Sequence, residues 1–262
     1  HMAGGMDSDR IVISPTWNTE RSAYLILCKE SVPPDQQDFR GCFRPSNPKG
    51  ANILVAEKRY WLFYSGMASR RVHRCSKTPE NAIGLAVADS PEGPWTKTGS
   101  NPVLRTRGAA WWFGDVQARN PCPLVRAGKY WLYYERSQAG LVSIPPAVTL
   151  AIAGKPEGPY AEGGYLWSLM RGGDVMVWPL GPSVAAWVGS GEPGTASTLQ
   201  YAADGRRFSA MQNLQKAPTA GGVYRPEAFT DSEKGQMVDW GLKTHFPDEG
   251  LPFIERFDCR WQ

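Results

Sequence analysis

Short apolar segments separated by turn residues recur along the whole chain. In the clearest case, apolar residues 123–125 and 130–134 flank the turn Ala127-Gly128-Lys129, and this arrangement predicts a β-hairpin. Four further pairs of segments follow the same pattern: residues 11–13 with 23–28, 53–55 with 60–64, 175–177 with 184–188, and 228–229 with 236–240. No long segment has the 3.6-residue spacing of an amphipathic helix. The pattern therefore predicts an all-β protein.

The hairpins belong to internal repeats. Tyr60 corresponds to Tyr130 at an offset of 70 residues, and Gly93 corresponds to Gly158 at an offset of 65. Each unit consists of a hairpin, one or two further strands and a glycine turn before an aromatic residue, and repeated units of roughly 40–50 residues or more are typical of β-propellers. Five units fill the chain, and they begin near Ile11, Ala51, Phe113, Gly172 and Tyr224. The repeats thus predict a five-bladed β-propeller, with a β-sandwich as the alternative.

Composition and charge narrow the function classes. Of the 262 residues, 42% are hydrophobic and 21% are charged, which is typical of a globular protein with a core. The net charge of +4 comes from scattered Lys and Arg, so no nucleic-acid partner is expected. No apolar run reaches the ~20 residues of a membrane helix, so no membrane partner is expected either. Residues 11–262 are interpreted as one domain, and residues 1–10 as a cloning remnant and tail. The sequence leaves the oligomeric state open and favours the cytoplasm over secretion, which a removed export signal would still allow.

Metal and thiol chemistry find little support in the sequence. The five cysteines contain no CxxC pair, which argues against a zinc ribbon and against a dense disulfide framework. Apart from His1 the only histidines are His73 and His245, too few and too far apart for a zinc site of the usual spacing. We therefore expect no cofactor and no set of metal ligands, and a structural cation near the propeller axis stays an open alternative.

Four segments carry a resemblance to a known group of enzymes. They are YWLFYSG at 60–66, IGLAVADSPEGPW at 83–95, RNPCPLVRAGKYWLYYE at 119–135 and RPEAF at 225–229. Over roughly residues 11–258 the chain resembles the five-bladed propeller glycosidases, namely the arabinanase/xylosidase family 43, the invertase and levansucrase families and the neoagarobiose-hydrolase family. The resemblance implies that the residues preceding each hairpin converge on one central pocket, that this pocket holds the catalytic carboxylates, and that the substrate is an oligo- or polysaccharide.

The position before the hairpin holds a carboxylate in each of the last three units: Asp115, Asp174 and Glu227. They lie 59 and 53 residues apart, about one blade each. Glycoside hydrolysis needs a carboxylic acid that protonates the leaving oxygen and a second carboxylate opposite it. The residues expected to bind substrate beside them are Arg119, Asn120, Arg225, Trp111, Trp112 and Trp178, because arginines bind polar groups and indole rings stack on sugars. For the carboxylates a turn, capping or ion-pairing role is the alternative, and for the tryptophans the alternative is packing between blades.

The chain also departs from the resembled pattern. Its carboxylates stand in the last three units rather than the first three, and Asn120-Pro121 replaces the Asp-Pro of the motif. Asp115 precedes that position by five residues. Glu135, at the end of the third hairpin, is expected to be a surface or ion-paired residue, with a position facing a neighbouring blade as the alternative.

A mechanism follows from the resemblance. RPEAF is the closest match to the acid-bearing strand, so Glu227 is expected to be the general acid. Asp174 would raise the pKa of that acid by like-charge repulsion, and Asp115 would activate water, with inversion as the outcome. A propeller that binds carbohydrate or a protein partner without catalysis is the second hypothesis, and a glycosyl-transferring relative with a carboxylate nucleophile is the third.

Overall fold

The computed structural model describes residues 9–18, 23–30, 43–44, 51–68, 80–105, 115–139, 144–162, 168–190, 197–213, 220–223, 240–245 and 253–258. Over these ranges the chain forms nineteen strands and no helix. The all-β prediction is therefore confirmed. None of the described segments is a helix long and apolar enough to cross a membrane.

The strands form five antiparallel sheets, which we number in chain order. Sheet 1 contains β1 (Asp9–Asn18) and β2 (Ala23–Glu30). Sheet 2 contains β3 (Phe43–Arg44), β4 (Ala51–Ala56), β5 (Arg59–Ala68), β6 (Glu80–Ala88) and β7 (Thr96–Lys97). Sheet 3 contains β8 (Asp115–Arg126), β9 (Lys129–Ala139), β10 (Ile144–Ala153), β11 (Ala161–Glu162) and β12 (Met170–Arg171).

The last two sheets are smaller. Sheet 4 contains β13 (Gly173–Leu180), β14 (Ser183–Ser190), β15 (Thr198–Ala202) and β16 (Ser209–Asn213). Sheet 5 contains β17 (Ala220–Val223), β18 (Trp240–His245) and β19 (Phe253–Asp258). Sheets 1 to 4 overlap the first four predicted units, although β12 at the predicted start of the fourth unit pairs with β10 of sheet 3. In sheet 5, β17 precedes the predicted start at Tyr224, and the predicted hairpin residues 228–229 and 236–239 lie outside the described residues.

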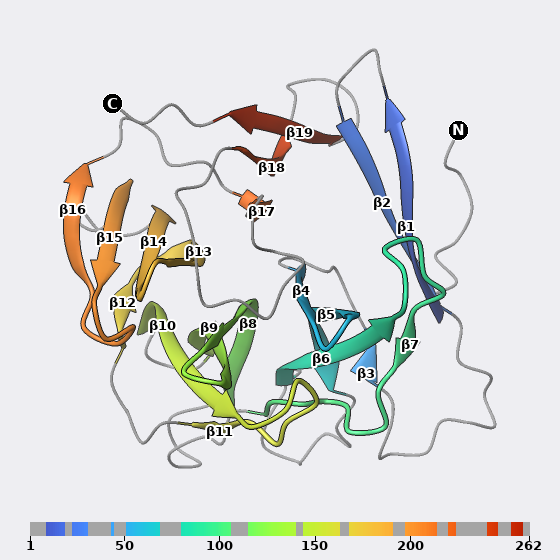
Figure 1. The fold of residues 1–262 in the computed structure, drawn as a ribbon, viewed down its shortest axis with the longest axis horizontal. Coiled ribbons are helices and arrows are strands. Elements are labelled where there is room, and N and C mark those ends of the chain that lie inside the picture. The colour runs from blue at the N-terminus through green and yellow to red at the C-terminus, as the bar shows by residue number, and fades with distance from the viewer. Residues whose placement is uncertain are drawn as a thin grey trace.

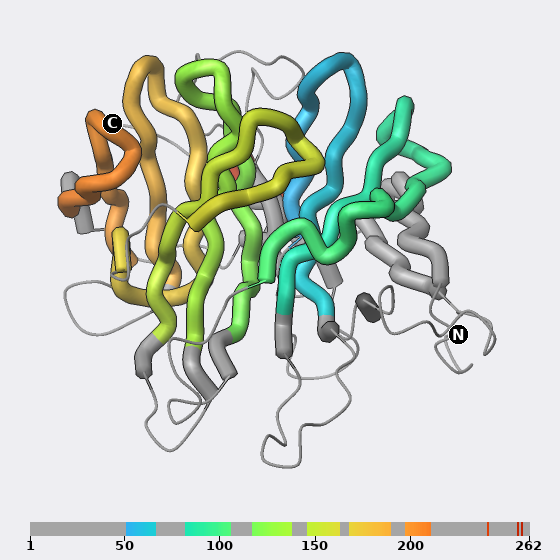
Figure 2. Tube along the Cα trace, turned by 90° about the horizontal axis from the view of Figure 1, so that it is seen from below, coloured from blue at the N-terminus to red at the C-terminus, as the bar shows by residue number. Residues whose placement is uncertain are grey.

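The five sheets surround a common centre in chain order (Figure 1). One strand from each of sheets 2 to 5 lies nearest that centre, and these strands contact each other in a ring: β4 contacts β8, β8 contacts β13, β13 contacts β17, and β17 contacts β4. The N-terminal hairpin lies beside the C-terminal sheet, because β2 contacts β19. The hairpin turns of sheets 2, 3 and 4 all lie at one end of the molecule (Figure 2), so the starts of β4, β8 and β13 lie at the opposite end.

Side chains of sheet 3 fill the space on both of its faces. On β9, Trp131 and Tyr133 pack into the cluster that includes Trp178 and Trp187 of sheet 4, whereas Leu132 and Tyr134 pack into the cluster of sheet 2. Successive residues of a strand point to opposite faces, so a strand with a neighbouring sheet on each side reads as an unbroken apolar run. Burial on both faces explains why YWLYY does not alternate with polar residues.

The repeated glycine turns seen in the sequence are also structural repeats. Gly93 has φ +89° and Gly158 has φ +90°, and each is followed by a cis proline and then an aromatic residue. A Cβ atom at Gly93 would lie 2.9 Å from the backbone nitrogen of Trp95, and one at Gly158 would lie 3.0 Å from that of Tyr160. Both turns therefore require glycine for the same two reasons, its positive φ and its lack of a side chain.

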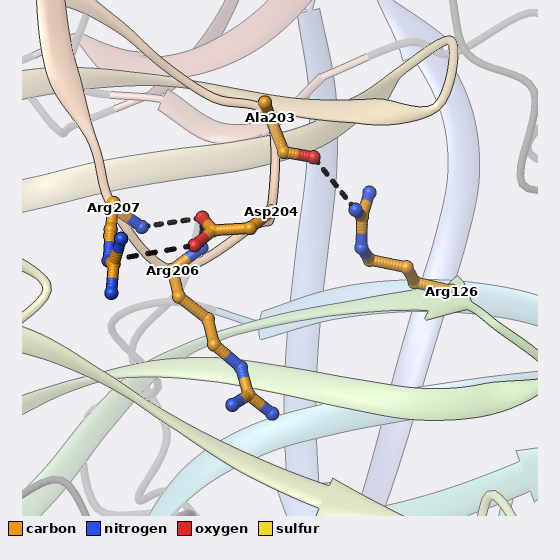
Figure 3. A network of polar contacts seen from close by, with 5 residues as sticks. All are labelled: Arg126, Ala203, Asp204, Arg206 and Arg207. Atoms are coloured by element: carbon orange, nitrogen blue, oxygen red, sulfur yellow. Dashed lines mark hydrogen bonds and ion pairs between the residues drawn. The ribbon is translucent and has the colours of Figure 1, made fainter.

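A polar cluster joins sheets 3 and 4 at the end where the hairpin turns lie (Figure 3). The guanidinium of Arg126 donates hydrogen bonds to the carbonyl oxygens of Pro182 and, at 2.9 Å, Ala203. The Asp204 carboxylate accepts hydrogen bonds from the backbone N–H groups of Arg206 and Arg207, each at 2.8 Å. Through Arg126, the cluster connects the hairpin turn of sheet 3 to two turns of sheet 4.

Candidate functional site

The site begins at an irregularity in β8. The pairing of β8 with β9 shifts by one residue between Arg119 and Cys122, and Asn120 inside this bulge has φ +51°. Asparagine tolerates this left-handed conformation better than most residues. The Asn120 backbone N–H donates a hydrogen bond to the Ser65 hydroxyl of β5 at 3.0 Å. The bulge therefore turns the backbone away from its own sheet and connects it to sheet 2.

Sheet 4 contributes a second left-handed residue. Asp174, near the start of β13, has φ +54° and a half-buried side chain. The next residue, Val175, is held against sheet 3, because its carbonyl oxygen accepts a hydrogen bond from the Cys122 thiol at 3.3 Å. Asn120 and Asp174 thus occupy related positions, each at an irregular point of a strand next to the centre.

Glu135 of β9 lies between these two residues. Its side chain is only 4% exposed, and its Oε1 accepts a hydrogen bond from the Val175 backbone N–H at 3.4 Å. The Asp174 backbone and the Asn120 side-chain amide also lie near enough to affect this carboxyl group electrostatically. The expectation of a surface or ion-paired residue is wrong, because the packing of sheet 4 against sheet 3 covers this carboxyl group. Across the described segments, no Lys or Arg forms an ion pair with it.

Burial raises the pKa of the Glu135 carboxyl above its usual 4.5. The nearby Asn120 amide, the hydrogen bond from the Val175 N–H and the nearby Asp174 backbone oppose this rise in pKa, whereas repulsion from the Asp174 carboxylate adds to it. Desolvation is the largest of these effects. Glu135 and Asp174 are therefore a pair of interacting carboxyl groups in contrasting environments, one buried and one half-buried.

Arg119 precedes Asn120 in β8, and on the backbone it is directly opposite Glu135 in the pairing of β8 with β9. Its terminal Nη2 donates a hydrogen bond to the Ser137 hydroxyl at 3.0 Å, while its Nε is buried and has no partner among the described residues. A guanidinium that is only partly hydrogen-bonded is suited to hold a polar group of a ligand.

The structure places the predicted residues unequally. Asn120 and Asp174 both lie near Glu135, and Arg119 is the residue before Asn120 in β8. Asp115 is the first residue of β8 and pairs with Ala139, but only its backbone is described. Four further predicted site residues lie outside the described ranges: Trp111, Trp112, Arg225 and Glu227.

Trp178 belongs to the core and not to the site. Its side chain is fully buried, and its ring packs against Trp187 with the centroids 5.2 Å apart. The prediction that Trp178 stacks on a sugar is wrong, because no face of the ring is open, and the alternative of packing within the core applies. No group of three or more His, Cys, Asp or Glu that could hold a metal ion is found in the described part of the chain.

The fold of this chain is similar to that of glycoside hydrolases of known structure. No protein-family model matches the chain, and no curated protein matches it. Among solved structures, a family 117 glycoside hydrolase from the marine bacterium Zobellia galactanivorans matches with a TM-score of 0.67 and 28% identity, over 92% of this chain and 68% of that one. The chain resembles a family 117 glycoside hydrolase. The resemblance to propeller glycosidases that the sequence indicated is thereby confirmed.

Two more distant matches are family 43 glycosidases. An exo-β-1,3-galactanase from Phanerochaete chrysosporium matches with a TM-score of 0.48 and 15% identity, over 67% of this chain and 40% of that one. An enzyme from Xanthomonas citri in complex with xylose matches with a TM-score of 0.46 and 14% identity, over 65% of this chain and 55% of that one. The chain spans about half the length of these two proteins.

Proposed function

We propose that this protein is a glycoside hydrolase built on a five-bladed β-propeller, with an oligo- or polysaccharide as substrate. The observation that carries the proposal is the similarity to a family 117 glycoside hydrolase over 92% of the chain. The meeting of Arg119, Asn120, Glu135 and Asp174 near the centre of the sheets supports it independently. Of these residues, Asp174 is a half-buried carboxylate of the kind that acid–base chemistry on a glycosidic bond requires.

In this proposal the catalytic work is divided among three carboxyl groups from successive sheets. Glu227 is the general acid that protonates the leaving oxygen, and Asp115 is the base that activates water from the opposite face. Asp174 lies between them along the chain and interacts with the acid. Arg119 and Arg225 bind substrate hydroxyl or carboxylate groups, with Asn120 beside Arg119, and Trp111 and Trp112 provide stacking faces for the sugar.

Inversion is the stereochemical outcome that we propose. An inverting enzyme needs roughly 6.5–9.5 Å between the carboxyl groups of acid and base, which leaves room for the attacking water, whereas ~5–5.5 Å would place a nucleophile against the sugar. Proton NMR of the newly formed anomer at early times distinguishes the two outcomes.

The test is a screen of plant and algal oligosaccharides with product chromatography, in which wild type is compared with Glu227→Gln. Wild type is expected to release shorter sugars from at least one member of the panel. Glu227→Gln should lose much more activity on substrates with poor leaving groups than on activated aryl glycosides, because only the former need protonation. Full activity of Glu227→Gln on a natural substrate would refute the assignment of the acid.

One observation favours a second candidate function, a propeller that binds carbohydrate without cleaving it. The left-handed residue of β8 is Asn120, whose amide cannot titrate, and its side chain is engaged with Glu135. Binding of panel sugars by wild type without any product after prolonged incubation would support this candidate over the hydrolase.

A further inference from the structure

The Glu135 carboxyl group has an unusual set of partners for a buried acid. It belongs to sheet 3 but accepts a hydrogen bond from a backbone N–H group of sheet 4, that of Val175, at 3.4 Å. The Asp174 backbone next to Val175 and the side-chain amide of Asn120 on the neighbouring strand also interact with this carboxyl group. In the described part of the molecule, no cation compensates the charge of this carboxyl group.

Such burial is costly for the fold. A carboxylate removed from water loses solvation that neutral hydrogen-bond donors only partly replace. An apolar residue of similar size at this position would fill the same space without that cost. The presence of a carboxyl group at residue 135 is therefore not explained by packing alone.

The partners of Glu135 suggest that explanation. Asn120 and Asp174 both have positive φ, at +51° and +54°, and such conformations persist only where the surroundings hold them. The Glu135 carboxyl group interacts with polar groups of both residues and accepts a hydrogen bond from the N–H group of Val175, which directly follows Asp174. Removing its acceptor oxygens would weaken the connection to β13 and to Asn120 together.

We infer that Glu135 is a positioning residue, which holds Asp174 of sheet 4 and Asn120 of sheet 3 in fixed relative positions. The effect of Glu135 on activity rests on the proposed function, in which Asp174 is the carboxylate that interacts with the general acid. Glu135 itself is too deeply buried to touch a substrate and acts through its two partners.

The experiment compares wild type with Glu135→Gln and with the control Glu162→Gln. Glu162 is also a hydrogen-bonded glutamate, and it accepts from the Tyr134 hydroxyl at 2.8 Å, but it is exposed and lies on the edge strand β11. Glutamine keeps the size of residue 135 and one acceptor oxygen, but it introduces an N–H₂ group that faces the donors of Asn120 or of the β13 backbone. The variant should therefore stay folded while its partners rearrange.

Two readouts separate positioning from mere structural support. The first is turnover of the best substrate from the oligosaccharide screen, measured well below the melting temperature. Glu135→Gln should lower kcat by at least about tenfold, as expected when a reacting group is displaced, with KM changed by less than about threefold. The second is the amide NMR signals of Asp174 and Val175, which should shift in Glu135→Gln and stay in place in Glu162→Gln.

Each outcome decides the inference. A fall in kcat with shifted amide signals supports it, and an unchanged kcat in an active, folded Glu135→Gln overturns it. If wild type turns over no sugar, the proposed function fails, and the amide signals alone decide whether Glu135 fixes Asp174. A second variant, Asn120→Asp combined with Glu135→Gln, restores one acid and one amide to the pair and should regain activity relative to Asn120→Asp alone. Absence of that recovery would contradict the direct contact between the two side chains.

Discussion

Replacing Gly205 by alanine tests how tightly sheets 3 and 4 pack. Gly205 lies in the turn between β15 and β16 and has φ +69°. A Cβ atom there would lie 2.9 Å from the Tyr133 hydroxyl, 3.0 Å from Cζ3 of Trp131 and 3.2 Å from Cγ2 of Val184. These contacts come from residues that are themselves at most 7% exposed, so none can move freely aside.

The expected loss has a backbone part and a contact part. Alanine in the left-handed region costs about 1–2 kcal/mol, and the reduced freedom of the unfolded chain offsets about 0.4–1 kcal/mol of this. Overpacking adds roughly 1–3 kcal/mol. The hydrogen bond from the Tyr133 hydroxyl to the Gly205 carbonyl, 2.7 Å long, contributes about 1 kcal/mol more if it breaks. We expect Gly205→Ala to lower the free energy of unfolding by about 2–4 kcal/mol in total.

Gly128→Ala provides the matched control. Gly128 has φ +63°, and a Cβ atom there would meet nothing within 4 Å. Gly128→Ala should therefore lose only the free energy that comes from placing alanine in the left-handed backbone conformation. Thermal and urea unfolding should place Gly205→Ala well below Gly128→Ala, with a fall in Tm of roughly 2–4 °C per kcal/mol for a chain of this size. Equal losses in the two variants would show that the packing around Gly205 is looser than described.

Two further predictions concern charged residues. Arg126→Ala should destabilise the protein by about 1–3 kcal/mol in urea unfolding, because it removes two hydrogen bonds to sheet 4 carbonyls and a guanidinium 5.5 Å from the Trp131 ring centroid. The Arg207 side chain is 94% exposed, so Arg207→Ala is the control and should change the free energy of unfolding by less than about 0.5 kcal/mol. A similar loss in both variants would contradict the role of Arg126 in joining the two sheets. For Glu135 the folded-state pKa is raised above the unfolded value of 4.5, so its contribution to stability is present in full below that pH and is lost as the pH rises through the folded-state pKa. The unfolding free energy of wild type relative to Glu135→Gln should therefore fall with increasing pH above about 4.5, and parallel curves for the two proteins would show that Glu135 is not buried as a titrating acid.

Local features of the fold could be predicted from the sequence because neighbouring residues determine them. The turn at Gly128 and the two glycine turns at Gly93 and Gly158 depend on backbone conformations that few other residues adopt, and the structure has positive φ at all three. The repeat spacing also located the first hairpin strands of sheets 1, 3 and 4 to within a few residues, since each unit must contain a whole hairpin.

Features that depend on packing between sheets could not be predicted. The sequence marks Glu135 only as a charged residue after an apolar run, and its burial depends on how sheet 4 lies against sheet 3. The same packing decides that Trp178 belongs to the core. The bulge at Asn120 shifts the register of β8, and a register shift changes which side chains face the neighbouring sheet. Asp174 could be found because its position relative to a hairpin is local.

The proposal that this protein hydrolyses glycosidic bonds with carboxyl groups near the centre of its sheets is tested most directly at Asp174. Asparagine tolerates the left-handed backbone of this position, so Asp174→Asn should fold normally and bind sugar as wild type does. Product release from the best oligosaccharide of the screen should be measured for both proteins, with sugar binding measured by calorimetry in the same samples. The account predicts that wild type releases product and that Asp174→Asn loses at least about tenfold in rate while its affinity for sugar is kept. Equal rates for the two proteins, or sugar binding by wild type without any product, would contradict it.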